Sequence, residues 1–248
     1  ASLQGHSDDI PFEVIVVDDC PTDTTAEILN GVPGLVYLPS DSNVGFVASC
    51  NQGAKSARGR YLLFLNNDTI VRPGWMARLR ETFDFVPDAG LVGSKLVYPD
   101  GRLQEAGGII WRDASGWNRG KFQDAGKPEY NFLCEVDYCS AASVMITKSL
   151  FVSLGGFDAK YAPAYYEDVD LAFKIRAAGR KVLYQPLSTV IHYEGITSGT
   201  DTSAGAKKHQ VSNRATFATA WETVLADKPV NGDVTALEAS HPGKKRIL

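Results

Sequence analysis

Short apolar runs alternate with helical patterns over the first hundred residues. The apolar runs predict strands at 13–17, 35–38, 61–65 and 91–93. Valine and isoleucine dominate the first run, which therefore predicts a strand that is buried on both faces. Helices are predicted between the strands, at 24–29, 47–57 and about 73–85. This alternation predicts an α/β domain with a doubly wound, mostly parallel sheet.

The pattern changes beyond about residue 100, where glycine and tryptophan mark loops and short strands. Further strands are predicted at 144–146, 181–184 and 189–193. Helices are predicted at 167–178, which has an apolar stripe at helical spacing, and at 206–226. The polar tail from residue 227 contains two prolines and is typical of a linker.

The composition is that of an ordinary soluble globular protein, with 248 residues, 44% hydrophobic and 22% charged. A net charge of −4 argues against general nucleic-acid binding. The longest apolar run, 61–65, is too short to cross a membrane, and we see no signal peptide. The four cysteines form no CxxC pair, so a zinc site is not expected. We expect the cysteines to be free thiols. A disulfide between Cys134 and Cys139 stays open.

Acidic and amide side chains follow two of the predicted strands. Asp18 and Asp19 end the first strand, and Asn66, Asn67 and Asp68 end the third. The carboxyl ends of parallel strands meet at one edge of a sheet, where ligands bind. Carboxylates gathered without Lys or Arg favour a divalent cation. Helix capping is the alternative: the two interpretations are balanced for Asp18, whereas the amides beside Asp68 favour a functional role.

Three further groups of residues are candidates for chemistry. The loop with Asn43 and Gly45, and Asn51 after it, indicates either a tight turn or a ligand contact. The helix predicted from Glu167 opens with more acids than capping needs, so at least one is expected to act on a ligand. An ionised aspartate there can accept a proton from an attacking hydroxyl. His192 is either a core histidine or a metal ligand.

These motifs resemble family 2 of the inverting glycosyltransferases, which have the GT-A fold, and in particular rhamnosyltransferase-like bacterial enzymes that build cell-surface polysaccharides. The resemblance covers about residues 2–200. Six blocks carry it in order: VIVVDDCPTD from Val14, NVGFVASCNQG from Asn43, ARGRYLLFLNNDT from Ala57, GGFD from Gly155, EDVDLAFKIRAAG from Glu167, and His192.

The resemblance implies a role for each candidate residue. Nucleotide-sugar contacts fall on Asp18, Asp19, Asn43, Gly45, Asn51, Asn66 and Asn67, with Asp19 matching a base or ribose contact. The 66–68 block matches the DxD motif, so Asp68 would hold Mn²⁺ or Mg²⁺ on the diphosphate, although Asn66 replaces its first aspartate. His192 matches a residue that approaches the metal or diphosphate. Asp168 matches the catalytic base, with Glu167 as its neighbour, and residues 140–142 match a segment facing the sugar.

The same resemblance implies how the chain is organised. Residues 1–100 form the donor-binding half, residues 101–226 the acceptor-binding and catalytic half, and residues 227–248 a linker toward a further domain. The sequence begins like the helix that follows the family's first, central strand, so we expect that strand to be missing. The expected partners are a nucleotide-diphosphate sugar, a glycan or lipid-linked glycan acceptor, and other domains of a longer chain. The expected location is cytoplasmic, with association with the inner face of the membrane left open.

The implied reaction is one displacement: an acceptor hydroxyl attacks the anomeric carbon, Asp168 takes its proton, and the configuration inverts. A nucleotidyltransferase that makes nucleotide sugars is one alternative. Such an enzyme usually needs an early basic, Gly-rich loop for the triphosphate, and this sequence supplies none. A non-catalytic nucleotide-sugar-binding module is the other, and the intact acids argue against it. The sequence does not identify the sugar, the nucleotide or the acceptor. Four aromatic residues could either stack on sugar rings or pack in the core: Trp111, Trp117, Tyr161 and Tyr165.

Overall fold

The computed structural model describes residues 2–5, 10–21, 23–193 and 209–233. The first part of the chain contains four helices and four strands among these residues: α1 (Ser2–Gly5), β1 (Val14–Asp19), α2 (Thr25–Asn30), β2 (Leu35–Ser40), α3 (Gly45–Ser56), β3 (Tyr61–Leu65), β4 (Thr69–Val71) and α4 (Trp75–Phe85). The predicted alternation of strands and helices is therefore confirmed. The strand predicted at 91–93 is longer, because it extends over the buried run of β5 (Ala89–Val97).

The second part is richer in short strands: β6 (Leu103–Glu105), β7 (Gly108–Ile110), β8 (Gly116–Asn118), β9 (Cys134–Glu135), β10 (Ser143–Thr147) and β11 (Lys181–His192), with the 3₁₀ turns η1 (Pro128–Tyr130) and η2 (Ala159–Tyr161) and the helices α5 (Lys148–Ser153), α6 (Glu167–Ala177), α7 (His209–Ala220) and α8 (Glu222–Ala226). The two strands predicted at 181–184 and 189–193 are one strand with a register shift. The long final helix is divided at Trp221 in its described part.

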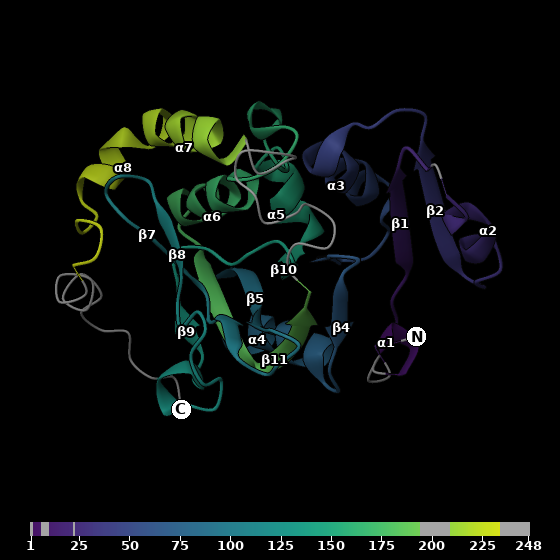
Figure 1. Ribbon diagram of the computed structural model, residues 1–248, viewed down its shortest axis with the longest axis horizontal. Helices are drawn as coiled ribbons and strands as arrows, with labels where there is room; N and C mark the ends of the chain where they lie inside the picture. The colour runs from purple at the N-terminus through teal and green to yellow at the C-terminus, as the bar shows by residue number, and fades with distance from the viewer. Residues whose placement is uncertain (1, 6–9, 22, 194–208, 234–248) are drawn as a thin grey trace.

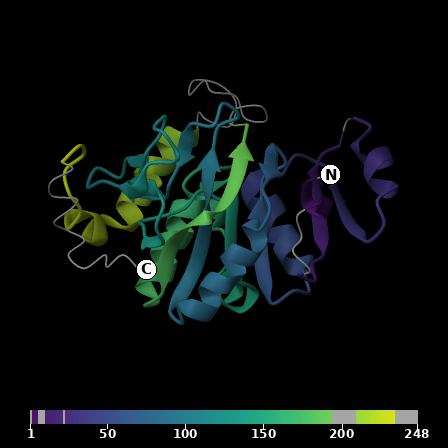
Figure 2. The ribbon, with the colours of Figure 1, turned by 90° about the horizontal axis from the view of Figure 1, so that it is seen from below.

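A seven-stranded sheet forms the centre of the molecule, in the order β3-β10-β5-β11-β4, with β6 and β9 added beside β5 and β11. β5 and β11 are parallel, whereas β10 is antiparallel to both of its neighbours, so the sheet is mixed. Helices cover both faces: α6 packs over β5 and β11 from one side and α4 from the other (Figures 1 and 2). Neighbouring strand residues divide accordingly, Leu91 facing one core cluster and Val92 the other.

The parallel pair β1 and β2 forms a separate sheet, set apart from the larger one in Figure 1. α3 covers one face of β1, where Gly53 lies against Val17 and Ile15. The expectation that this strand is buried on both faces is wrong, because each of its six residues is partly exposed. Within the described residues, β1 and β3 are each hydrogen-bonded along one edge, to β2 and β10.

The predicted linker begins with residues that contact the body of the domain. Lys228 pairs with the buried Asp137 at 2.6 Å, and the backbone N–H of Arg112 donates to the Pro229 carbonyl. All four cysteines are free, as expected. No helix in the described part of the chain is long and apolar enough to cross a membrane.

Candidate active site between β3, β11 and α6

Pairing of β4 with β11 places His192 beside Asp68. His192 is the register partner of Thr69, the residue after Asp68, and the Tyr193 N–H donates to the Asp68 carbonyl. The imidazole Nε2 consequently lies 3.2 Å from Asp68 Oδ1 and 3.4 Å from the Asn66 side-chain nitrogen. Three of the residues predicted for a metal and diphosphate site, from two distant parts of the chain, are therefore adjacent.

Gln104 fixes the orientation of this histidine. Its Oε1 lies 2.8 Å from His192 Nδ1, and the side chain is buried in β6. Because a carboxamide oxygen can only accept, the hydrogen of a neutral imidazole sits on Nδ1 and leaves a lone pair on Nε2. The sequence offered no signal for Gln104, because nothing in a three-residue buried strand distinguishes a ligand-orienting glutamine.

The resulting arrangement has two electron-rich atoms in contact. Nε2 of His192 faces Oδ1 of Asp68, which is buried and accepts no hydrogen bond from the residues that the structure describes. A buried carboxylate oxygen without a partner is costly, and a cation held by both atoms would satisfy it. No cluster of three His, Cys, Asp or Glu side chains exists in the described ranges, so Asn66 and the ligand would have to supply the remaining oxygens. The residues present thus fit a divalent cation bound together with a diphosphate.

A short turn, residues 140–142, connects this group with the start of α6. The N–H of Asn66 donates to the Ala142 carbonyl at 3.0 Å, and the N–H of Ala141 donates to Asp168 Oδ2 at 3.1 Å. The Asn66 backbone, two residues before Asp68, and the Asp168 carboxylate are thus hydrogen-bonded to adjacent residues of one turn. No Lys or Arg of the described residues forms an ion pair with Asp68 or Asp168, which leaves both carboxylates available to a ligand.

Asp168 has the surroundings expected of a proton acceptor. Burial raises the pKa of its carboxyl, and the N–H groups of Ala141 and Val169 act in the opposite direction by stabilising the carboxylate. A raised pKa makes a carboxylate a better base than it would be in water. The residue as a whole is partly exposed.

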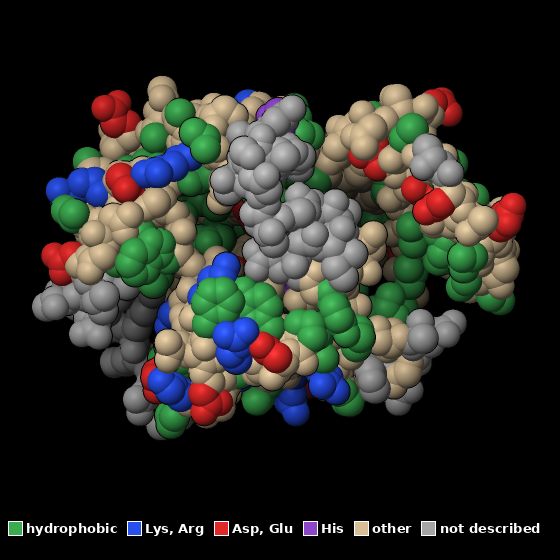
Figure 3. Space-filling view, viewed as in Figure 1, with side chains coloured by type: hydrophobic (Ala, Val, Ile, Leu, Met, Phe, Trp, Pro, Cys, Tyr) green, Lys and Arg blue, Asp and Glu red, His purple; other side chains and the backbone are tan. Residues whose placement is uncertain are grey.

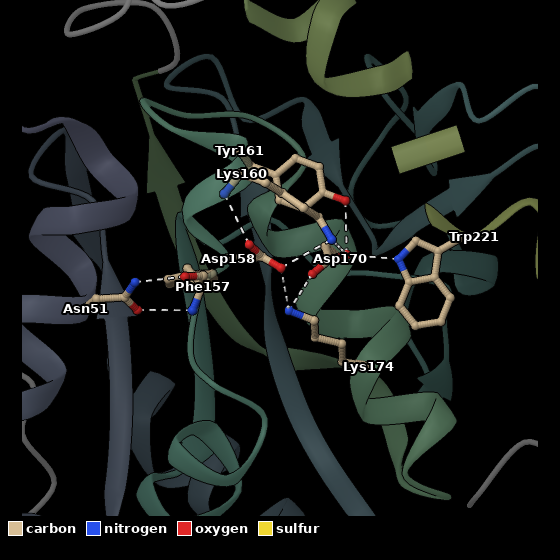
Figure 4. Close-up of polar contacts among 8 residues, drawn as sticks. All are labelled: Asn51, Phe157, Asp158, Lys160, Tyr161, Asp170, Lys174 and Trp221. Atoms are coloured by element: carbon tan, nitrogen blue, oxygen red, sulfur yellow. Dashed lines mark hydrogen bonds and ion pairs between the residues drawn. The ribbon is translucent and has the colours of Figure 1, made fainter. Parts of the chain in front are cut away.

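The other two acids of the helix start have different surroundings. Glu167 is 5% exposed, its Oε2 has no hydrogen-bond partner, and burial together with the Asp168 charge raises its pKa far above the ordinary value. Asp170 is 1% exposed and receives hydrogen bonds from Tyr161 and Trp221, with Lys160 and Lys174 as ion-pair partners (Figure 4). Of the acids that helix capping does not explain, Asp168 is the candidate base, whereas Asp170 belongs to a buried ion-pair network.

The acids that end β1 make their contacts at α3 and β2. Both carboxylate oxygens of Asp19 accept backbone hydrogen bonds, from Val44 at 2.6 Å and Gly45 at 2.8 Å, so Asp19 holds the start of α3. Asp18 accepts from the Tyr37 hydroxyl at 2.7 Å. Gly45 has a φ of +81°, and a Cβ there would lie 2.6 Å from the Pro163 side chain, so close approach requires glycine.

The remaining predicted contacts are structural or at the surface. The amide of Asn51 both donates to and accepts from the backbone of Phe157 (Figure 4), so these bonds use both ends of its side chain. Asn43 and Asn67 are exposed. Of the aromatic candidates, Trp111 and Tyr161 are fully buried and belong to the core, whereas Trp117 is 46% exposed.

Figure 3 shows the surface indented between the part that contains β1 and β2 and the rest of the molecule. The α/β architecture, with acidic residues at strand ends, is that of the GT-A class of glycosyltransferases. A solved structure of GalNAc-T7 with UDP, GalNAc and Mn²⁺ supports this fold: it superposes with a TM-score of 0.66, at 16% identity, over 87% of this chain and 44% of that one.

The chain belongs to glycosyl transferase family 2, whose model matches residues 2–151. It is 33% identical over 206 residues to an O-antigen biosynthesis protein of Myxococcus xanthus, covering 77% of this chain and 16% of that protein. It is 26% identical over 225 residues to N-acetylglucosaminyl-diphospho-decaprenol L-rhamnosyltransferase of Mycobacterium tuberculosis, covering 82% of this chain and 73% of that protein. The chain therefore spans a small part of the first relative and most of the second.

Proposed function

We propose that this domain is an inverting glycosyltransferase that moves a sugar from a nucleotide-diphosphate donor to a hydroxyl of a glycan or lipid-linked glycan during cell-surface polysaccharide synthesis. One observation carries the proposal: the 140–142 turn binds both the Asn66 backbone and the Asp168 carboxylate. A donor diphosphate beside Asp68 and an acceptor hydroxyl beside Asp168 would then lie on either side of a single reacting carbon.

The Asp68, His192 and Asn66 side chains would hold a divalent cation, with Gln104 orienting the histidine. When bound, such a cation neutralises negative charge on a leaving diphosphate. The proposed cation is Mn²⁺ or Mg²⁺. The structure of GalNAc-T7 was solved with Mn²⁺ and UDP.

Asp168 performs the proton chemistry in this proposal. Its carboxylate accepts the acceptor hydroxyl proton while the acceptor oxygen bonds to the anomeric carbon and the bond from that carbon to the diphosphate breaks. The products are the glycosylated acceptor and a nucleoside diphosphate, and the configuration at the carbon inverts. Burial and the Asp168 charge raise the pKa of Glu167 well above its ordinary value, which disfavours a second negative charge beside the base.

The donor's nucleotide is proposed to bind near the start of α3, beside Asp18, Asp19, Asn43 and Gly45. Asp19 accepts from the Val44 and Gly45 N–H groups there, and Asp18 accepts from the Tyr37 hydroxyl. The mycobacterial relative, named as a rhamnosyltransferase acting on a diphospho-decaprenol-linked sugar, supports a lipid-linked acceptor. We also propose a cytoplasmic location, peripheral to the membrane that carries such an acceptor, and further domains as partners, since the chain covers 16% of the O-antigen biosynthesis relative.

The test is a thermal-shift panel of nucleotide sugars with and without Mn²⁺, followed by product analysis with the stabilising donor. We expect metal-dependent stabilisation and release of nucleoside diphosphate. Release of pyrophosphate would instead identify a nucleotidyltransferase. Donor binding without transfer or hydrolysis under Mn²⁺ or Mg²⁺ would identify a binding module.

A further inference from the structure

The segment that leads into the candidate base, residues 157–166, is held by three different helices; we call it the bridging segment. At its start, Asn51 of α3 hydrogen-bonds both backbone groups of Phe157. In its middle, Asp158, Lys160 and Tyr161 join the ion-pair network of Asp170 and Lys174 on α6 (Figure 4). Its last residues, immediately before Glu167, are held by α7.

Asn213 makes the contact between α7 and the bridging segment. Its side-chain nitrogen donates to the carbonyl oxygens of Tyr161, Ala164 and Tyr165, at 2.8, 2.9 and 3.0 Å. An amide has two hydrogens, so three acceptors share two donors. The side chain is 5% exposed, which means that water cannot readily replace it. One residue of α7 therefore satisfies three carbonyls at and after the end of the 3₁₀ turn η2.

The backbone at this point adopts a conformation that needs such support. Tyr165 and Tyr166 have φ angles of +77° and +71°, in the left-handed region that non-glycine residues rarely adopt. Tyr166 is the residue before α6, its carbonyl accepts from the Asp170 N–H, and its hydroxyl donates to the Ala114 carbonyl. Two consecutive residues in this region reverse the chain and decide where the first turn of α6 begins.

The position of Asp168 depends on where that turn begins. Its Oδ2 meets the Ala141 N–H at 3.1 Å, and Ala141 belongs to the turn that also holds Asn66. A displacement of the helix start would separate the carboxylate from this turn and from the candidate metal site. α7 itself carries no hydrogen-bond partner of Asp168 among the described residues, so its influence passes through the backbone of the bridging segment.

We infer that Asn213 is a positioning residue for the catalytic base: by holding three carbonyls of the bridging segment, α7 fixes the start of α6 and so the place of Asp168. A second bond supports the same connection, because Trp221, which follows α7, donates from Nε1 to Asp170 Oδ1 at 2.9 Å (Figure 4). The inference rests on the proposed function, and it assigns α7 a role in turnover and none in donor binding.

The test compares Asn213→Ala with Ser212→Ala in the whole chain. Ser212 is the exposed neighbour on the same helix, and its hydroxyl bonds the His209 carbonyl within α7. Asn213→Ser is the milder variant, which retains one donor, and it decides the outcome if the alanine variant does not fold. Three quantities are measured: hydrogen exchange over residues 161–170, kcat for transfer, and the Kd of uridine and thymidine diphosphate with Mn²⁺.

We expect both Asn213 variants to exchange faster over 161–170 and to lose about 10- to 100-fold in kcat, because small displacements of a catalytic group cost this much. The nucleoside diphosphate Kd should stay within about threefold of the wild-type value, since transition-state contacts and ground-state binding are separable. Ser212→Ala should change none of the three.

Exchange that is unchanged in both Asn213 variants overturns the inference, as does a normal kcat despite faster exchange, which would mean a purely structural role. Loss of kcat and nucleotide affinity together in a folded variant also overturns it. If the wild-type chain transfers no sugar from any donor, the proposed function fails, and the exchange measurement still decides whether α7 fixes the bridging segment.

Discussion

The two candidate carboxylates, Asp68 and Asp168, differ in what surrounds them. Asp68 lies between β3 and β4 and contacts the His192 imidazole, which Gln104 orients. Its Oδ1 accepts no hydrogen bond from the described residues. Asp168 lies in the first turn of a helix, and both of its oxygens receive backbone N–H groups. The first arrangement lacks positive charge and suits a cation, whereas the second supports a carboxylate while burial raises its pKa.

This difference would allow the two acids to perform separate tasks in the proposed reaction. Lone pairs from side chains converge at Asp68 and His192, and such a set favours a metal ion with its bound phosphate. Backbone donors at Asp168 orient the carboxylate without neutralising it, and they leave it able to take a proton. The following predictions test this contrast, beginning with the largest expected effect.

Asp168→Asn removes the proton acceptor and keeps the shape of the side chain. We expect kcat for transfer to fall by about 10³-fold, within the range that general-base catalysis contributes. Binding of the donor with Mn²⁺ should persist, because the amide still fills the site. Steady-state kinetics and donor calorimetry measure the two quantities, with Asp88→Asn, an exposed aspartate paired with Lys181, as control. Normal turnover in the Asp168 variant would assign the base elsewhere.

Asp68→Ala removes the candidate cation ligand. Donor affinity measured in Mn²⁺ should fall by at least about 100-fold, toward its metal-free value, which exceeds the usual cost of losing an outer partner. Calorimetry with and without Mn²⁺ checks this, and Asp100→Ala, at an exposed aspartate paired with Arg102, is the control. Metal-dependent binding that survives the substitution would place the cation at a different site.

Gln104→Ala leaves the ligand side chains intact and releases the imidazole of His192. The Mn²⁺ affinity should fall by about tenfold, the lower range for an outer partner of a metal ligand. Gln104→Glu keeps an acceptor for Nδ1–H and should retain the affinity, which makes it the matched control. Equal affinities for the alanine variant and the wild type would show that His192 does not need this partner.

The pH dependence of kcat/KM should report Asp168. Because the base must be ionised, activity rises with pH, and burial moves this acidic limb above 3.8, the ordinary pKa of an aspartate. Glu167→Gln should leave the limb in place, since the raised pKa of the buried glutamate favours its uncharged form. The profile is measured at saturating Mn²⁺. A limb at or below 3.8 in the wild type would contradict the assignment.

The fold was largely accessible from the sequence, because periodic apolar runs define strands and helices locally. The predictions for 35–38, 61–65 and 167–178 correspond closely to β2, β3 and α6. The prediction of a fully buried β1 failed for a tertiary reason: an apolar strand is buried only if partners cover both faces, and α3 covers one. The register shift that joins 181–193 into one strand likewise depends on pairing with β5.

The candidate site was accessible in part. Motifs of acidic, amide and imidazole side chains indicated Asp68, Asp168 and His192 as candidates. The roles proposed for these three residues remain predictions. Gln104, the N–H of Ala141 and Asn213 carry no such mark, because their importance comes from which atoms lie within hydrogen-bond distance. Likewise, nothing in the sequence separated Asp170 from its neighbours, although its burial beside Lys174 gives it a structural task.

By itself, the sequence determined where acids, amides and glycines occur relative to strand and helix ends, since these are properties of neighbouring residues. The tertiary structure alone decided which of them meet. Strand pairing brought His192 to Asp68, and one turn brought Asn66 and Asp168 to adjacent backbone groups. Both outcomes depend on contacts between distant parts of the chain, and a local pattern contains no information about those distances.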